Sequence, residues 1–453
     1  MFAIINIKYM IKKNNKGLNI LILHAYWECR GSESAVRAMI DSLRYKLPVK
    51  KMKIMIMRKE ITQFPYNNIE IIKPYPYFKN KQSELAAVTG NYPSLSHEDI
   101  IIILLDFLLI LLSFGKLSFT KTGREFLKSI KEADIVIHAP DGPFIGDIYR
   151  SRAIVNLDFL HLWRLLIVKI LKKKPIFFYA PSVGPFQGKI KNLLRKFILK
   201  KIDLIIIREP ISAEYLKTQL GLESFVTSDS ALQNDIPKNY LTKYDDLSNI
   251  LRILKNKKTI GIVVTDLLWH PIYRNYPKLA LNIKNHWLIT TDYLIKKGYQ
   301  ILLIPQWINE IKTNEMSLLK DISNLNQERI FILPSNIDSF GQQIIISKLF
   351  CLISMRYHPS LWAIKMNVPF ITISYEHKFM GFIKKTELFD YIINTEEMNA
   401  DKIIDKFNTL EKNYIKIKDR LKNISQFLKK DSKKTNELII DKLIKLGWKN
   451  FNN

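Results

Sequence analysis

The chain has 453 residues and a formal charge of +28, which comes from 70 Lys and Arg against 42 Asp and Glu. This length accommodates two or three domains, and the 47% of hydrophobic residues can build their cores, which excludes wholesale disorder. The two cysteines, Cys29 and Cys351, are too few for a disulfide framework or a zinc cluster. The positive charge favours an anionic partner: nucleic acid, a membrane face or an anionic substrate.

The N-terminal residues lack the pattern of a signal peptide. Residues 1–16 have no apolar core followed by a small-residue cleavage site, so we expect a cytoplasmic protein with an extension over residues 1–18. Residues 19–24 form an apolar run typical of a buried strand, and a loop with Gly31 and Ser32 leads into a helix. A strand, a loop and a helix start can cradle a phosphate, although the pattern G-x-G-x-x-G is missing.

A long apolar run follows. Residues 100–112 are apolar except for Asp106, and they are fewer than the roughly 20 residues that a helix needs to cross a bilayer. A buried helix is the first interpretation. The second is a helix that dips into one leaflet of a membrane, which the basic residues around it would favour.

Three further strands of the first half end in loops with polar residues. The strands are predicted at residues 134–138, 175–179 and 204–207, with helices at 149–171 and 190–201. The loops after these strands bring in Asp141, then Ser182 and Gly184, then Arg208. The segment from Gly184 to Lys189 is too short for a P-loop and no Ser or Thr follows the lysine, so we reject ATP binding.

The second half repeats the alternation of strands and helices. Its strands are predicted near residues 260–264, 300–304, 329–333, 349–353 and 369–373. Such alternation favours parallel sheets, so we expect an α/β protein with Rossmann-like domains at 19–235 and 257–397. A polar linker is predicted at 236–256, and a basic helical tail at 398–453.

Residues 350–364 are predicted to form a strand, a tight turn and a helix. Pro359 suits the first helical position, which places His358 at or beside the helix cap and Arg356 at the end of the strand. A helix N-terminus at the carboxyl edge of a parallel sheet favours anions. An Arg-x-His could also just cap its neighbours, but the next strand delivers a second cation, Lys378, to the same edge.

Together these segments resemble the polysaccharide pyruvyltransferase family from residue 19 to about residue 388. The resemblance rests on ordered blocks: Gly31–Ala35, the loop after His138, Tyr179–Gly184, Arg208–Ser212 with Asp229, Ser354–His358 and Ser374–Lys378. It implies two Rossmann-like domains that face a cleft, similar to the GT-B glycosyltransferases. It also implies transfer of pyruvate from phosphoenolpyruvate onto two sugar hydroxyls, which forms a cyclic ketal. The chain departs from the family's usual residues at Ser32 and at residues 139–143.

The resemblance and the chemistry of phosphoenolpyruvate suggest roles for several residues. Arg208 and Arg356 suit the carboxylate and phosphate of the donor, because a guanidinium pairs two oxygens at once, and Lys378 adds a third positive charge. By family analogy, His358 protonates the methylene carbon. Donor-side and acceptor-side candidates complete the set: Ser182 and Gly184 for phosphoenolpyruvate, and Gly31, Ser32 and Asp141 for the acceptor.

The protonation state of His358 should depend on the donor. A helix N-terminus and a nearby arginine both disfavour imidazolium, so we expect a neutral ring in the empty enzyme and a higher pKa once the donor binds. No D-x-D, HExxH or clustered His/Cys pattern occurs, so we predict no metal and no cofactor other than the co-substrate. His24 and His138 lie at the ends of predicted strands, and we expect them to have a structural role.

Two other functions stay open at this point. A glycosyltransferase of the same architecture would use a nucleotide sugar, and a non-catalytic protein could use the basic surface to bind a membrane or a polyanion. Nucleic acid is not expected, because no recognition helix, zinc finger or aromatic RNA-binding strand occurs. The acceptor would be a cell-surface glycan or its lipid-linked precursor, and a lipid-linked acceptor would place the enzyme at the inner face of the membrane, in peripheral contact with anionic lipid.

Overall fold

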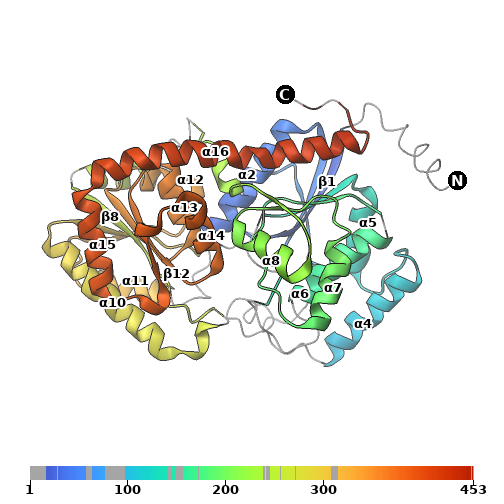
Figure 1. Ribbon diagram of the computed structural model, residues 1–453, viewed down its shortest axis with the longest axis horizontal. Coiled ribbons are helices and arrows are strands. Elements are labelled where there is room, and N and C mark those ends of the chain that lie inside the picture. Colours follow the sequence, from blue (N-terminus) through green and yellow to red (C-terminus); the bar gives the residue numbers. More distant parts are fainter. Residues whose placement is uncertain are drawn as a thin grey trace.

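The computed structural model contains two lobes, each built on a parallel sheet, with a long helix laid across both (Figure 1). The residues that it describes are 17–27, 29–57, 64–76, 97–140, 145–147, 157–171, 173–237, 240, 245–255, 257–270, 272–307, 315–449 and 451.

The first lobe holds a sheet of strand order β3-β2-β1-β4-β5 with parallel pairing throughout. Its strands are β1 (Leu18–Ala25), β2 (Val49–Ile56), β3 (Glu70–Ile72), β4 (Ile135–His138) and β5 (Ile176–Phe178). Its helices are α2 (Arg30–Lys46), α4 (His97–Leu112), α5 (Lys121–Glu132), α6 (Leu157–Leu166, continued by a π-helical turn Ile167–Leu171), α7 (Lys189–Leu199) and α8 (Pro210–Leu220). A short pair, β6 (Ile206–Ile207) and β7 (Phe225–Val226), and a 3-10 turn, η2 (Ser230–Leu232), complete it.

The second lobe holds a parallel sheet of order β10-β9-β8-β11-β12-β13. Its strands are β8 (Thr259–Val263), β9 (Gln300–Leu303), β10 (Ile330–Ile332), β11 (Cys351–Ser354), β12 (Phe370–Ser374) and β13 (Ile392–Asn394). Its helices are α9 (Asp245–Lys255), α10 (Pro277–Lys296), α11 (Glu315–Ser323), α12 (Ser339–Ile346), α13 (Tyr357–Lys365), α14 (His377–Thr386), α15 (Ala400–Lys412) and α16 (Tyr414–Lys445). The central strands β8, β11 and β12 are buried along their whole length because helices cover both faces of the sheet, and the predicted pair of Rossmann-like sheets is confirmed.

Helix α2 ties the first lobe to the second. The carboxylate of Glu33 lies 2.6 Å from Arg30 and 2.9 Å from Arg37, and it accepts a hydrogen bond of 2.8 Å from Ser339 of α12. Arg37 also pairs with Asp338, at 3.1 Å. These buried charges are matched across the junction, so they fix the orientation of α2, the helix that carries Gly31.

The basic tail is helical, as predicted, and α16 contacts both lobes. Leu421 and Leu428 pack into the core of the second lobe, whereas Ile439 and Leu443 pack into the core of the first. Figure 1 shows α16 running along one edge of the whole molecule.

The prediction of a buried helix at residues 100–112 is wrong for one face of the helix, the face that points away from the protein. Residues Ile103, Phe107 and Ile110 of α4 are buried, but Leu105 and Leu108 are about half exposed. A single sequence cannot separate these cases, because a helix that is apolar all round suits a core or a lipid surface equally well. Among the described residues, no helix combines the length and the apolar character needed to cross a membrane.

Two smaller corrections concern the linker and the helix near the predicted cap. The segment 236–256, expected to be irregular, contains α9, which buries Leu247 and Leu254. Helix α13 starts earlier than Pro359 suggested, because its N-cap is Arg356. His358 is therefore the second residue of the helix, and Pro359 is the third instead of the first.

Candidate active site

Arg208 is buried at the carboxyl end of β6, with 2% of its surface exposed. Its Nε donates a 2.8 Å hydrogen bond to the Oγ of Ser182, and its Nη1 donates one of 2.7 Å to the Oδ2 of Asp229. The ring of Tyr357 lies 4.9 Å from the guanidinium carbon. A buried cation held by a carboxylate, a hydroxyl and an aromatic face has a fixed orientation, which an anion-binding group requires.

His358 meets Arg208 at the same carboxylate. The Nε2 of His358 lies 3.8 Å from the Oδ2 of Asp229, the oxygen that Arg208 contacts. Among the described residues this Nε2 finds no hydrogen-bond partner, so it is free to face a ligand. The structure thus brings together two of the predicted residues, one from each lobe.

The pKa of His358 falls to about 3, chiefly because the ring is buried. Asp229 opposes this shift, while the positive charges of Arg208 and Lys378 add to it. The expectation of a neutral ring is confirmed, although burial outweighs the neighbouring charges. A neutral imidazole must gain a proton before it can act as an acid.

Gly31 lies against the ring of His358. A Cβ at position 31 would overlap Nδ1 and Cγ of that ring, so glycine is the residue that lets the two lobes approach here. Gly31 belongs to the first turn of α2, whose N-cap is Cys29. Ser32, the other acceptor-side candidate in this turn, has its Oγ 3.2 Å from the Sγ of Cys29. Both acceptor-side candidates of α2 therefore lie at the junction with His358.

Arg356 has a different environment from Arg208. Its guanidinium carbon lies 4.8 Å from the ring of Trp269 and 5.5 Å from that of Trp307, and its Nη2 lies 3.8 Å from Glu315. Its Nε and Nη2 hydrogen-bond to none of the described residues. Sequence reasoning missed the two tryptophans, which stack on the cation, while Glu315 and Tyr375 interact with its N–H groups.

Lys378 comes from the first turn of α14, and its Nζ lies 2.5 Å from the carboxylate of Glu376. Burial alone would raise the pKa of Glu376, but Lys378 and His270 hold it well below its usual range, so Glu376 is ionised. His270 lies 3.3 Å from the other oxygen of Glu376. The positive charge of Lys378 contributes to the lowered pKa of His358, and its role at a donor stays a prediction.

Two helices begin at this site without a side-chain cap. Neither Arg356, the N-cap of α13, nor Glu376, the N-cap of α14, accepts a hydrogen bond from the first turn of its helix. Uncapped first-turn N–H groups attract anions, and so do cations: Arg356 and Lys378 belong to the starts of these two helices, and Arg208 shares Asp229 with His358. The geometry therefore suits a small, highly charged anion.

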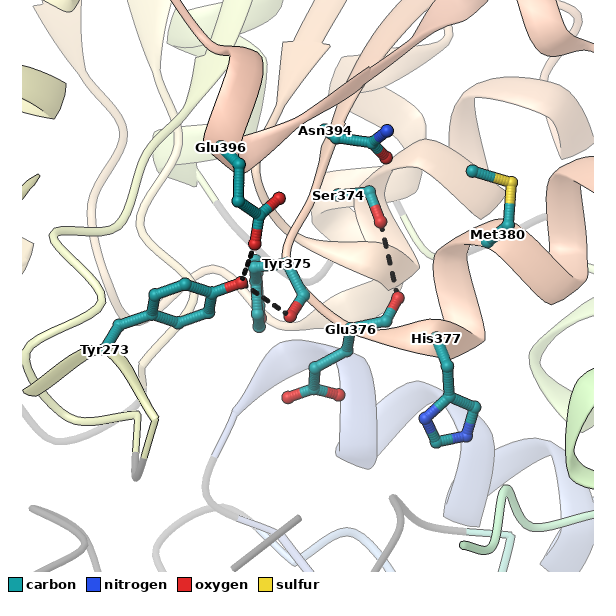
Figure 2. Close-up of a pocket in the computed structure, with 8 residues that line it drawn as sticks. All are labelled: Tyr273, Ser374, Tyr375, Glu376, His377, Met380, Asn394 and Glu396. Atoms are coloured by element: carbon teal, nitrogen blue, oxygen red, sulfur yellow. Dashed lines mark hydrogen bonds between the residues drawn. The ribbon is translucent and has the colours of Figure 1, made fainter. Parts of the chain in front are cut away.

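A pocket of about 230 Å³ opens beside these helix starts. Its lining residues are Tyr273, Ser374, Tyr375, Glu376, His377, Met380, Asn394 and Glu396. Figure 2 shows Glu376 and His377 pointing to the same side, away from Ser374 and Asn394. Arg208, Arg356 and His358 do not line this pocket, which adjoins their cluster through Tyr375 to His377.

The remaining predicted residues are less closely tied to the site. Gly184 has a φ of +82°, and a Cβ there would overlap the ring of Tyr215, so backbone conformation and packing already require glycine. Its contact with a donor stays a prediction. Asp141 lies outside the described residues. Asp229, by contrast, was given no role from the sequence, although a carboxylate directly after a strand is a recognisable signal.

A second group of titratable residues lies in the core of the first lobe. His24, His138 and His161 are buried, and one ligand atom of each lies within 4.8 Å of the others, so these residues could approach a metal ion. A tetrahedral zinc site with bonds of about 2.0–2.1 Å needs donor atoms roughly 3.4 Å apart. The rings of His24 and His161 are instead stacked, with centroids 3.9 Å apart, which indicates aromatic packing between neutral rings. The predicted absence of a metal stays a prediction.

Comparison with known proteins agrees with the geometry. The family model described as polysaccharide pyruvyl transferase matches residues 30–377, more than half of the chain. AmsJ, an amylovoran biosynthesis protein of Erwinia amylovora, is 22% identical over 321 residues, which cover 68% of this chain and 72% of AmsJ.

Solved structures with similar folds include TcCGT1 in complex with UDP, at a TM-score of 0.56 and 10% identity over 95% of this chain and 100% of the other. They also include the UDP-GlcNAc 2-epimerase of Neisseria meningitidis bound to UDP-GlcNAc, at a TM-score of 0.55 and 13% identity. This match covers 94% of this chain and 100% of the epimerase chain. At such identities the likeness concerns the fold alone, and it confirms the predicted GT-B-like architecture. With the ordered motifs placed on that fold, the chain belongs to the polysaccharide pyruvyl transferase family.

Proposed function

We propose that this protein transfers pyruvate from phosphoenolpyruvate onto two hydroxyls of a sugar in a cell-surface glycan or its lipid-linked precursor, and so forms a cyclic ketal. The observation that carries the proposal is the convergence of Arg208 and His358 on one oxygen of Asp229, beside the uncapped start of α13. The donor is a small frame with a carboxylate and a phosphate, which matches fixed guanidinium groups and open helix N-termini.

The anionic groups of the donor would bind to Arg208, Arg356 and Lys378, with first-turn N–H groups as further donors of hydrogen bonds. Burial is the main cause of the low pKa of His358; the negative charges of the donor would oppose it by favouring the imidazolium directly and by offsetting Arg208 and Lys378, and Asp229 acts in the same direction. His358 would therefore take up a proton when the donor is bound and transfer it to the methylene carbon.

Protonation of the methylene carbon leaves an oxocarbenium-like centre at the adjacent carbon. One sugar hydroxyl adds to this carbon and loses its proton, and a second hydroxyl then displaces phosphate and closes the ring. The first turn of α2, with Gly31 packed on His358 and Ser32 next to it, is the proposed acceptor side. The atoms of the ketal and of the released phosphate all come from the two substrates, so the reaction needs no further reactant.

The test is turnover of defined substrates followed by mass spectrometry. The protein is incubated with phosphoenolpyruvate and a panel of soluble, polymeric and lipid-linked sugars. The expected product gains the mass of one pyruvate less one water, with one phosphate released per product. Turnover of a nucleotide sugar with no phosphoenolpyruvate consumption would instead identify a glycosyltransferase and overturn the proposal.

A further inference from the structure

We propose that the outer faces of α4 and α7, with the turn at residues 113–119, form a docking surface for an anionic lipid bilayer. The proposal does not depend on pyruvyl transfer, because it rests on the exposed side chains of the first lobe. It goes beyond the proposed function by assigning a membrane-binding site to named residues.

Helix α4 is apolar on the side that faces away from the protein. Its buried stripe consists of Ile103, Phe107 and Ile110, together with Asp106. The side chains on the outer face are all aliphatic: Ile101, Ile102, Leu104, Leu105, Leu108, Leu111 and Leu112. A helix on the surface of a globular protein normally presents polar residues there, so this face is built for an apolar environment.

The turn after α4 extends this apolar face. Phe114, Leu117 and Phe119 are all more than half exposed. The turn is held in place by the buried carboxylate of Asp106, which accepts hydrogen bonds of 2.9 Å from the Oγ of Ser118 and 2.8 Å from the Oη of Tyr75. The exposed aromatic rings are therefore presented by a fixed turn.

Helix α7 has an apolar stripe on its solvent side. Its residues Ile190, Leu193, Leu194 and Phe197 follow the spacing i, i+3, i+4, i+7, and all are exposed, with Ile190 at 84%. The exposed lysines around the stripe are Lys189, Lys191, Lys196, Lys200 and Lys201. An apolar stripe flanked by lysines is the pattern of a helix that lies in a membrane interface.

Helix α6 connects the two helices. The ring of Phe107 on α4 stacks on Trp163 of α6, with centroids 4.1 Å apart. On the other side, Asp158 of α6 lies 2.6 Å from Arg195 of α7. In Figure 1 the three helices lie at one end of the molecule. Helices α4 and α7 therefore both pack on α6 in the first lobe.

The charges favour lipid over a second copy of this chain as the occupant. A lysine-rich rim on a chain with a charge of +28 repels an identical rim, but it attracts anionic headgroups. Helix α4 has 16 residues, so it is about 24 Å long and suits a position in the plane of one leaflet.

The test is co-sedimentation of the whole chain with vesicles, with no substrate present. One set of vesicles is phosphatidylcholine alone, and the other is an equal mixture of phosphatidylcholine and phosphatidylglycerol. We expect binding to the mixed vesicles, and we expect it to weaken between about 0.1 M and about 1 M salt, as the screening length shortens from ~10 Å to ~3 Å.

Two variants probe the apolar and the basic components separately. Leu105→Asp with Leu193→Asp removes exposed apolar groups, and Lys196→Glu with Lys200→Glu inverts the charge of the rim. Each pair should weaken vesicle binding by about tenfold or more, since one lysine near the surface is worth roughly a fivefold change. Circular dichroism checks that the variants stay folded.

The matched controls lie on α16, on the edge of the molecule that this helix covers. Ile415→Asp with Phe427→Asp changes side chains that are 76% and 52% exposed, and Lys416→Glu with Lys418→Glu makes the same change of charge. Both should bind vesicles like the parent protein. Equal loss in the controls, or a parent protein that ignores mixed vesicles, would overturn the proposal. So would a stable dimer in light scattering that only the α4 and α7 variants dissociate.

Discussion

His358 is the residue on which the proposed chemistry depends most directly. A protein with His358→Gln keeps a polar side chain of similar reach but loses the transferable proton. We expect kcat to fall by about 10²–10⁴-fold, as is usual when a general acid is removed, with a smaller change in KM for phosphoenolpyruvate. The measurement is phosphate release at saturating donor, with His286→Gln on α10 as the control. An unchanged kcat would assign the proton transfer to another group.

The ring of His358 should also report donor binding. The pKa of its imidazole is about 3 in the free protein, because of burial and of Arg208 and Lys378. A bound anion neutralises those cations, so the pKa should rise, and a fraction of imidazolium should appear towards neutral pH. An NMR titration of the ring with and without phosphoenolpyruvate measures this change. A pKa that stays low in the complex would contradict donor-assisted protonation.

Gly31 provides a test of the contact between the lobes. Gly31→Ala puts a methyl group into the ring of His358, so that either the ring or α2 must move. A displacement of about 1 Å at a reacting group costs roughly 10²-fold in rate, and we expect kcat to fall by that order while the protein stays folded. Ser323→Ala, at the end of α11 and outside the proposed site, should leave kcat unchanged. Equal activity of Gly31→Ala and the parent would show that the ring has room to move.

The candidate site residues that could be located from the sequence are those that follow the ends of predicted strands. Arg208, Arg356 and Lys378 were located because apolar runs stop just before them, and parallel strands bring such residues to one edge. Trp269 and Trp307 could not be found in this way, because their loops contact Arg356 only after folding. His161 was missed for the same reason, since it lies in the middle of α6 and meets His24 and His138 only in the folded core.

The contacts of Asp229 with its neighbouring elements lead us to expect that its replacement lowers the stability of the fold. Asp229 ends the segment after β7, caps η2 and neutralises the buried Arg208. Asp229→Asn leaves that arginine without a carboxylate partner, which typically costs about 3–5 kcal/mol in the free energy of unfolding. Urea unfolding measures the loss. The control is Asp235→Asn, because Asp235 is an exposed partner of Lys429 and such pairs contribute at most about 1 kcal/mol. An equal loss of unfolding free energy in both variants would show that Asp229 does not stabilise the fold through Arg208.

At the scale of the whole molecule, the two lobes are joined at two places that differ in chemistry. The junction at α2 is made of matched charges around Glu33. Helix α16 instead adds apolar side chains to both cores, and between them the buried carboxylate of Asp431 accepts a hydrogen bond from Ser228 and pairs with Lys385. The apolar contacts should stabilise the assembly, since burial of apolar surface is favourable without directional requirements. The charges should instead fix how α2 faces α13, because buried ion pairs tolerate few geometries. The active site lies between these two kinds of contact.

The buried histidines make the whole fold sensitive to acid. Burial lowers the pKa of His138 to about 4, and it lowers the pKa values of His24 and His161 well below their usual range. Below about pH 6.5 the unfolded chain therefore binds more protons than the folded one, so the free energy of unfolding falls as the pH falls. For His138 alone, the loss between pH 6.5 and about 4 amounts to roughly 3 kcal/mol.

The measurement is urea unfolding at several pH values between about 7 and about 4.5, above the range in which most carboxylates titrate. His138→Leu should flatten the decline, because it removes one of the protons that the unfolded chain takes up. Ile137→Val, in the same strand, should instead lower stability by about 0.5–1.5 kcal/mol at every pH and keep the slope of the parent protein. A parent protein whose stability is constant down to about pH 5 would mean that the buried rings gain protons without unfolding, and the histidine cluster would then have to be open to water.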